Sequence, residues 1–135
     1  MVCPMQPGEV RQRVLFDDGE LVVGEFVWNA QGIGDRRKSV TGAGHLLVVP
    51  WSPVRITHEG REPIVAEQRT VVFYSPGQAY QAEQLVHRPE RSYFIGMSPE
   101  ALAGCVESAD GRHVDPERSR FLGGHGPCSA EAFLA

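Results

Sequence analysis

The sequence of 135 residues has no long apolar run. No stretch approaches the roughly 18 consecutive apolar residues that a membrane-spanning helix needs. Residues 1–10 also lack the apolar core of a secretory signal. Membrane insertion and secretion are therefore not predicted, and we expect a cytoplasmic protein without membrane partners.

Cysteine is scarce as well. The three cysteines, Cys3, Cys105 and Cys128, are odd in number, lie far apart and form no C-x-x-C pair. A disulfide framework or a thiolate zinc site needs cysteines in regular, closely spaced sets. We therefore expect reduced thiols, which agrees with a cytoplasmic protein.

An excess of positive charge is missing too. Lys and Arg number 13 and Asp and Glu number 17, which gives a formal net charge of −4. The single basic run, Arg36-Arg37-Lys38, is interpreted as part of a solvated loop. Because a surface that binds duplex DNA needs several clustered cations, this chain alone is not expected to bind nucleic acid.

Short β-branched and aromatic runs, separated by Gly, Pro and Asn, dominate the sequence. Runs of this kind predict β-strands. Seven of them at this spacing, in a chain long enough for one domain, indicate a β-sandwich or β-barrel. The predicted strands cover residues 20–28, 44–50, 54–59, 63–67, 69–75, 79–85 and 91–97.

The segments between and after these strands are assigned from their turn and capping residues. Residues 29–42 are polar and rich in glycine, and we expect a mobile loop there. Gly60 lies in a predicted hairpin loop, where a positive φ is available to it. Ser98 and Pro99 predict the N-cap and the first position of a short helix that ends near residue 106.

Large side chains with a polar tip are candidates for a ligand pocket. Trp28, Trp51, Tyr74, Tyr80 and Tyr93 are of this kind. On one predicted strand face His45 could donate a hydrogen bond, and Arg55 could pair with a carboxylate or a hydroxyl of a ligand. The predicted ligand-binding residues are Trp28, His45, Trp51, Arg55, Tyr80 and Tyr93.

Residues 54–60 (Val-Arg-Ile-Thr-His-Glu-Gly), 70–80 (Thr-Val-Val-Phe-Tyr-Ser-Pro-Gly-Gln-Ala-Tyr) and 91–96 (Arg-Ser-Tyr-Phe-Ile-Gly) carry a family resemblance. Over residues 22–102 the chain resembles the N-terminal cupin-type domain of AraC/XylS-family transcription regulators. The resemblance implies a mainly β, cupin-like antiparallel barrel (double-stranded β-helix) with short C-terminal helices. It also implies a small-molecule effector in the barrel and a homodimer formed through the helices.

In that family a C-terminal pair of helix-turn-helix units binds DNA, and this sequence contains no basic, helical segment of that kind. The resemblance therefore implies two parts. Residues 1–106 are the ligand-binding barrel with its short helix. Residues 107–135 are a linker and the start of a truncated helical segment that leads to the DNA-binding part. The sequence leaves open which effector binds and whether the regulator activates or represses transcription.

Motifs for catalysis and for metal binding are absent from the sequence. There is no G-x-S-x-G motif and no complete Gly-rich phosphate loop. Metal-dependent cupin enzymes carry His and Glu ligands, and Leu47, Val49, Pro53 and Tyr80 stand near the corresponding positions. We therefore expect no metal, no cofactor and no enzymatic activity.

Two alternatives remain open from the sequence. One is a metal-dependent cupin enzyme, an isomerase or dioxygenase, with an atypical site formed by His45, His58 and His87, although His58 is expected to face solvent in its hairpin. The other is an oligomerisation domain whose barrel is filled with side chains.

Overall fold

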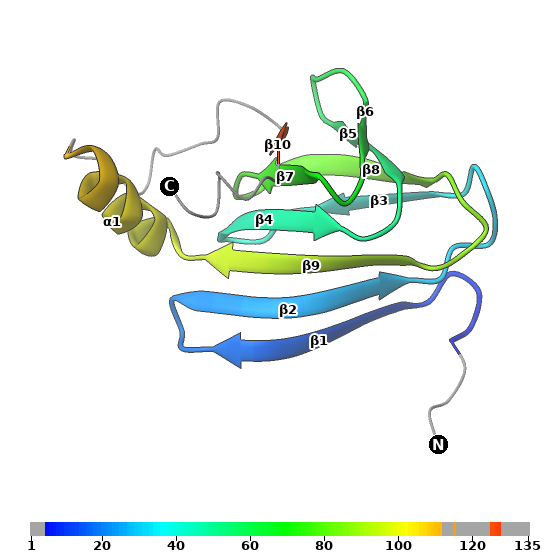
Figure 1. Ribbon diagram of the computed structural model, residues 1–135, viewed down its shortest axis with the longest axis horizontal. Helices are drawn as coiled ribbons and strands as arrows, with labels where there is room; N and C mark the ends of the chain where they lie inside the picture. The colour runs from blue at the N-terminus through cyan, green and yellow to red at the C-terminus, as the bar shows by residue number, and fades with distance from the viewer. Residues whose placement is uncertain (1–4, 112–114, 116–124, 128–135) are drawn as a thin grey trace.

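The computed structural model describes residues 5–111, 115 and 125–127, which form two antiparallel β-sheets and one helix (Figure 1). Helix α1 (Pro99–Asp110) follows the ninth strand directly. The strands are β1 (Val10–Asp17), β2 (Leu21–Trp28), β3 (Arg36–Val40), β4 (His45–Pro50), β5 (Val54–His58), β6 (Ile64–Ala66), β7 (Thr70–Tyr74), β8 (Ala79–Gln84), β9 (Glu90–Met97) and β10 (His125–Pro127).

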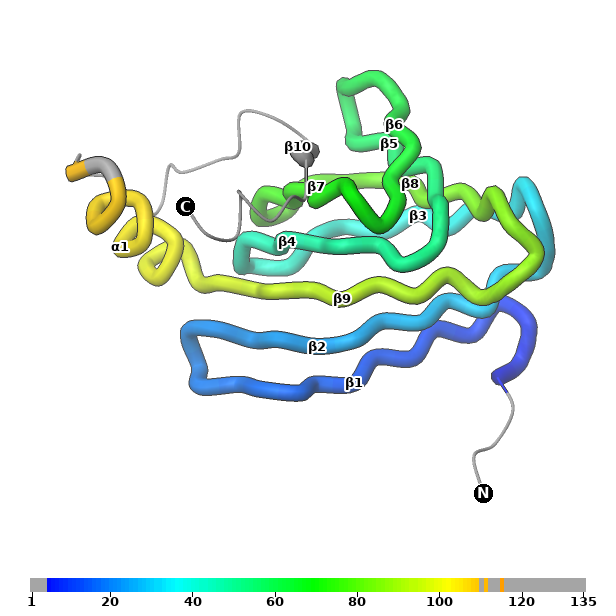
Figure 2. The backbone as a smooth tube through the Cα atoms, viewed as in Figure 1, coloured from blue at the N-terminus to red at the C-terminus, as the bar shows by residue number. Residues whose placement is uncertain are grey.

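The larger sheet has six strands in the order β1-β2-β9-β4-β7-β10, and the smaller has four in the order β3-β8-β5-β6. The chain crosses between the sheets repeatedly, so most neighbours in a sheet are distant in sequence (Figure 2). Side chains from both sheets meet between them. The buried core consists of Trp28, Val54, Ile56, Ala66, Val72, Tyr74 and Ala82.

All seven predicted strands are present as β2 and β4–β9, each with its ends within one residue of the prediction. The mainly β, antiparallel architecture is therefore confirmed. Strand β1 was missed because charged and polar residues occupy half of its positions, and it lies at the sheet edge with nearly every side chain exposed.

The prediction of a mobile loop over residues 29–42 is wrong for Arg36–Val40. These five residues form β3, which pairs with β8 along its whole length. Its side chains alternate, because successive residues of a strand point to opposite faces. Arg36, Lys38 and Val40 are exposed, whereas Arg37 and Ser39 are half-buried. The basic run is therefore not simply a solvated loop.

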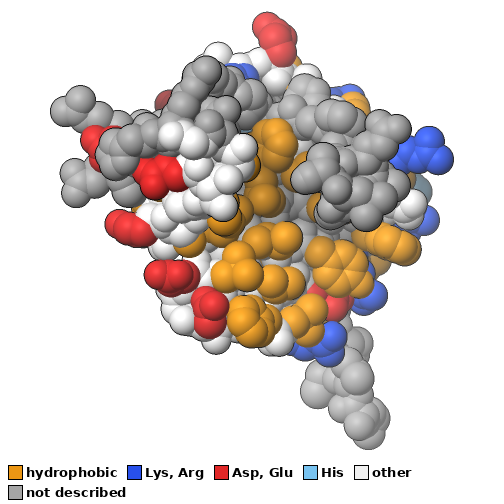
Figure 3. All heavy atoms as spheres, turned by 60° about the vertical axis from the view of Figure 1, so that its left-hand side comes forward, with side chains coloured by type: hydrophobic (Ala, Val, Ile, Leu, Met, Phe, Trp, Pro, Cys, Tyr) orange, Lys and Arg blue, Asp and Glu red, His pale blue; other side chains and the backbone are white. Residues whose placement is uncertain are grey.

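The two faces of the larger sheet are both rich in apolar side chains. The inward face packs on the core, and a glycine is needed there. A Cβ on Gly24 would lie 2.7 Å from the carbonyl oxygen of Arg13 and would overlap the ring of Phe94. On the outward face, hydrophobic side chains gather into one exposed surface (Figure 3). Successive register partners across this face are Phe16, Val23, Ile95, Leu47 and Phe73.

Helix α1 begins as predicted. The hydroxyl oxygen of Ser98 accepts a hydrogen bond from the N–H of Ala101 at 3.0 Å, and Pro99 takes the first helical position. The helix continues to Asp110, beyond the predicted end near residue 106, and Gly111 ends it in a left-handed conformation with φ of 75°. Within the described residues, no helix combines the length and apolar character that crossing a membrane requires.

The C-terminal segment is described only in part. Strand β10 (His125–Pro127), within the segment predicted to be a linker, pairs with β7. The helix start predicted at residues 129–135 lies outside the described residues.

Candidate ligand-binding cavity

A cavity of about 440 Å³ lies between the inner faces of the two sheets. This volume falls in the range of roughly 300–1,000 Å³ that is typical of pockets for small organic ligands. Aliphatic and aromatic side chains supply most of its wall. The polar residues of the wall are Gln12, Arg37, Lys38, Ser39, Tyr74, Tyr80, Glu90 and Ser92.

Strand alternation decides which side chains reach the cavity. In β9, Glu90, Ser92 and Phe94 are buried and line the cavity, whereas the residues between them are exposed. In β5, Val54 and Ile56 face inward in the same way. The cavity wall is therefore built mainly from alternate residues of strands from both sheets, with the exposed Lys38 of β3 as an exception.

Arg37 carries the positive charge that β3 brings to this wall. The central carbon of its guanidinium lies 4.8 Å from the ring centroid of Phe26, 5.3 Å from that of Trp28 and 5.8 Å from that of Tyr80. A cation among aromatic rings is attracted by their negative faces. The Arg37 Nη1 donates a long hydrogen bond of 3.4 Å to the hydroxyl of Tyr80. Its buried Nε has no hydrogen-bond partner among the described residues.

Glu90 and Ser92 form a buried polar pair on the opposite sheet. Both side chains are buried, and the hydroxyl of Ser92 donates a hydrogen bond to Oε1 of Glu90. Burial raises the pKa of Glu90, against the smaller lowering effects of the Ser92 hydrogen bond and the charge of Arg37. A carboxyl group that keeps its proton can donate a hydrogen bond as well as accept one.

Tyr74 completes the polar part of the wall. Its ring packs edge-on against the ring of Tyr80, with centroids 4.7 Å apart, and against that of His58, at 4.8 Å. Burial raises the pKa of the Tyr74 hydroxyl far above its ordinary value. The hydroxyl therefore stays protonated, and the ring holds Tyr80 in place beside Arg37.

Two of the six residues predicted to bind a ligand lie at this site. Tyr80 lines the cavity, and the buried ring of Trp28 lies against the guanidinium of Arg37. His45 is fully buried in β4 but is not part of the cavity wall.

The other three predicted residues lie outside the cavity wall because of strand alternation and turn position. Trp51 follows the end of β4 and is 55% exposed. Arg55 lies between the inward-facing residues of β5, and its Nη1 donates to Oε2 of Glu83 at 2.5 Å. Tyr93 lies between the inward-facing residues of β9 and is 41% exposed.

Arg37, Glu90 and Ser92 were not predicted to bind a ligand, and Tyr74 was a candidate for the pocket wall that the final set of six left out. One signal for Arg37 was available: in a strand, the middle residue of a three-residue basic run faces away from its two neighbours. For Glu90 and Ser92, the spacing of two residues places both on one face of β9.

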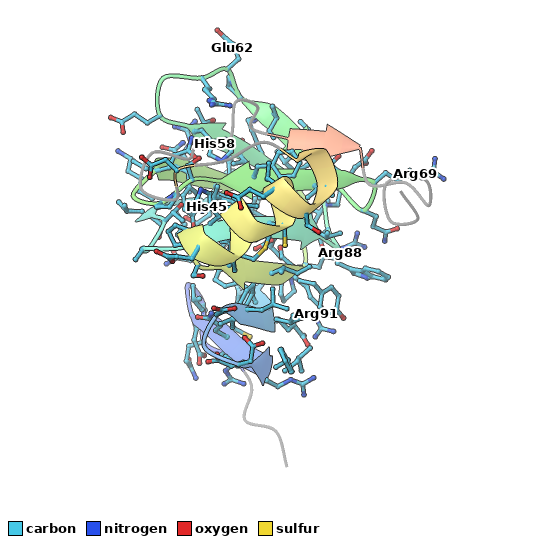
Figure 4. All side chains as sticks on the ribbon, turned by 90° about the vertical axis from the view of Figure 1, so that its left-hand side faces the viewer. His45, His58, Glu62, Arg69, Arg88 and Arg91 are labelled. Carbon is cyan, nitrogen blue, oxygen red and sulfur yellow. The ribbon has the colours of Figure 1, made fainter. Side chains whose placement is uncertain are left out.

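The histidines do not form the atypical metal site that the sequence left open. Among the described residues, no group of three or more His, Cys, Asp or Glu side chains is placed to hold a metal ion. Figure 4 shows His45 and His58 among the strands. Both are buried, which corrects the expectation of a solvent-facing His58, whereas His87 is exposed in a turn.

No family model and no curated protein matches the chain. The chain does match solved structures. The chain is similar to the cupin domain of Cnp3 from Schizosaccharomyces pombe, with a TM-score of 0.54, 11% identity, and coverage of 79% of this chain and 74% of that one. It is also similar to a candidate mannose-6-phosphate isomerase from Ralstonia eutropha, with a TM-score of 0.57, 13% identity, and coverage of 70% and 89%.

A third similar structure is the DMSP lyase DddQ from Ruegeria pomeroyi, with a TM-score of 0.54 and 12% identity over 65% of this chain. The match spans 46% of the lyase, less than half its length. At these identities the likeness defines the fold. The protein has a cupin-like fold, as the sequence predicted.

The prediction that the chain is not an enzyme is wrong, because its fold does not exclude enzymatic activity. Its structural neighbours include a DMSP lyase and a candidate isomerase, so enzymes use the fold that this chain adopts. The neighbours differ in function, and none of those named here is a transcription regulator. The function of this chain therefore has to be argued from its own cavity.

Proposed function

We propose that this chain binds a small organic molecule in the cavity between its sheets and serves as the effector-binding domain of an AraC/XylS-type transcription regulator. The cavity itself supports the binding role, because it joins a largely apolar wall to a few convergent polar groups. The regulatory role is supported by the resemblance of residues 54–60, 70–80 and 91–96 to that family.

The path from the cavity to the rest of a regulator runs through β9. This strand places Glu90, Ser92 and Phe94 on the cavity wall and passes through Ser98 into α1. In the proposal, a ligand that contacts β9 shifts the position of α1, through which two copies of the chain associate. Such a switch requires that the ligand bind the two states with different affinities.

The test of binding is a thermal-shift screen of small organic compounds against the wild type and a cavity-filling variant. Ala82 is 1% exposed and lines the cavity, so Ala82→Phe removes space that a ligand needs. A compound at roughly 100 times its Kd adds about 2.7 kcal/mol of stability to the wild type and none to the variant. The matched control is Val65→Phe on β6, where the side chain is 54% exposed.

The outcomes of this screen are distinct. A stabilising compound that acts equally on Ala82→Phe and the wild type binds elsewhere and overturns the cavity as the site. If the larger ring prevents folding, as judged by circular dichroism, Ala82→Leu fills less of the cavity and replaces it. A broad screen without any stabilising compound overturns the proposal.

Regulation is tested with the chain fused to a DNA-binding domain that requires dimerisation. A stabilising compound is expected to change the output of a reporter gene in the wild-type fusion and not in the Ala82→Phe fusion. A bound compound that leaves the reporter unchanged contradicts the regulatory role and leaves the binding role standing. Light scattering that shows only monomer at all concentrations contradicts the homodimer.

A further inference from the structure

The guanidinium of Arg37 has hydrogen-bonding capacity that the described protein does not use. A guanidinium carries five N–H donors in one plane. Three aromatic rings lie close to that of Arg37, and rings offer no strong acceptor in the guanidinium plane. The Nε hydrogen is buried without a partner, and Nη1 makes one long contact. Because Arg37 lines the cavity, its unused donors belong to the wall that a ligand would contact.

The charge of Arg37 is also not matched by an ion pair. All ion pairs of the described residues involve other side chains. Glu90 shares the cavity wall, but its carboxyl is hydrogen-bonded to Ser92 and burial favours its neutral form. Lys38, the second cation of the wall, is exposed to solvent. A half-buried positive charge without a counter-ion is costly, and an anion placed beside it removes much of that cost.

We infer that the cavity takes a small carboxylic acid with an apolar body, whose carboxylate pairs with the edge of the Arg37 guanidinium. This inference rests on the proposed function, because it specifies the ligand of the same cavity. The terminal nitrogens of a guanidinium present parallel N–H groups that match the two oxygens of a carboxylate. The apolar wall formed by Val48, Val72 and Phe94 faces the rest of the molecule.

The inference is tested with matched acids and amides, because an amide keeps the shape of the acid and loses its charge. The probes are phenylacetate, cinnamate and octanoate with their primary amides, and affinity is measured by isothermal titration calorimetry. At least one acid is expected to bind the wild type about 30-fold or more tightly than its amide. Loss of one partner of a buried charge pair weakens binding by a factor of this size.

The protein variants test the same contact from the other side. Arg37→Gln is expected to weaken binding of that acid about 30-fold or more and to leave the amide unchanged. Arg37→Lys keeps the charge without the planar fork and is expected to fall between Arg37→Gln and the wild type. The matched control is Arg36→Gln, which removes one positive charge from the exposed face of the same strand and is expected to leave binding unchanged.

The outcomes separate this inference from the proposed function. Equal affinity for acids and amides, or an unchanged affinity for the acid in Arg37→Gln, overturns the pairing of a carboxylate with Arg37. The cavity then remains a site for neutral compounds, provided that Ala82→Phe still prevents their binding. Wild type that binds none of the acids also overturns the inference, and the broad screen then decides the proposed function separately. If Arg37→Gln does not fold, Arg37→Lys and the acid–amide pairs on the wild type still give the answer.

Discussion

The outer and inner faces of the barrel wall carry the same kinds of charged side chain in different settings. On the outside, each of two glutamates lies between two arginines. Glu25 contacts Arg13 at 3.6 Å and Arg91 at 3.2 Å on the larger sheet. Glu83 contacts Arg36 at 3.3 Å and Arg55 at 2.5 Å on the smaller sheet. Figure 4 shows Arg91, together with Arg69 and Arg88, projecting from one side of the molecule.

On the inside, Arg37 and Glu90 form no ion pair with each other or with any other described residue. The contrast arises between adjacent residues, since Arg36 precedes Arg37 and Glu90 precedes Arg91. One step along a strand thus separates a charge that is already paired from a charge that faces the cavity without an ion pair. The difference teaches that charge type alone does not identify a residue of the cavity wall here, whereas the face of the strand does.

The largest expected effect compares the two tryptophans. Trp28 is 2% exposed and packs in the core beneath Arg37, whereas Trp51 is 55% exposed on the outside. Trp28→Ala is expected to lower the free energy of unfolding by about 3–5 kcal/mol, and Trp51→Ala by less than about 1 kcal/mol. Urea denaturation measures both. Equal losses would contradict the distinction between the faces.

The second effect concerns Glu90 and depends on pH. Since burial raises the pKa of Glu90 above its ordinary value of 4.5, the folded protein binds this proton more tightly than the unfolded chain. The stability that Glu90 contributes is therefore present below that value and is lost as pH rises through the folded pKa. Each unit of increase in pKa corresponds to about 1.4 kcal/mol.

Glu90→Gln removes this titration, so the variant is expected to gain stability over the wild type as pH rises above 4.5. Thermal unfolding of both proteins at about pH 5 and about pH 8 gives the difference, in which all other titrating groups cancel. Ser92→Ala, which removes the hydrogen bond that lowers the pKa of Glu90, should move the loss of stability to higher pH. A constant difference between Glu90→Gln and the wild type contradicts a raised pKa of Glu90.

The same contrast explains how far the sequence could predict the fold. The seven predicted strands have at least one apolar face, and period-two alternation with turn residues identifies them. Strand β1 carries three charged residues and lies at a sheet edge, and β3 contains three consecutive basic residues, of which Arg36 and Lys38 face solvent. Polar strands of this kind have the composition of loops, so composition alone could not reveal them.

The site was harder to predict than the fold because the two opposite faces of β9 both carry large apolar side chains. The outward face holds Tyr93 and Ile95, which are as apolar as the inward Phe94. Only the pairing of β9 with β2 and β4, which are distant in sequence, decides which face meets the smaller sheet. Tyr93 was predicted to bind a ligand because its large ring has a polar tip. A displacement of one residue exchanges the two faces, so the sequence could not show that Tyr93 points outward and Ser92 inward.

The smallest expected effect concerns the outer ion pairs. Glu83 joins Arg36 of β3 to Arg55 of β5, and both arginine side chains are substantially exposed. Exposed pairs contribute about 0.2–1 kcal/mol each, and salt screens them. Glu83→Gln is therefore expected to lower the free energy of unfolding by about 1 kcal/mol or less in low salt, with a smaller loss near 1 M salt, where the Debye length is about 3 Å.

Ligand affinity is expected to be unchanged in Glu83→Gln, because Glu83 is not part of the cavity wall. Urea denaturation at low and high salt, together with calorimetry of the acid probes, measures both properties in one variant. A loss of stability that is independent of salt would mean that the outer pairs hold β3 in register. A weakened affinity would mean that the position of Arg37 depends on the pairing of its neighbour Arg36, and the two faces of β3 would then act as one unit.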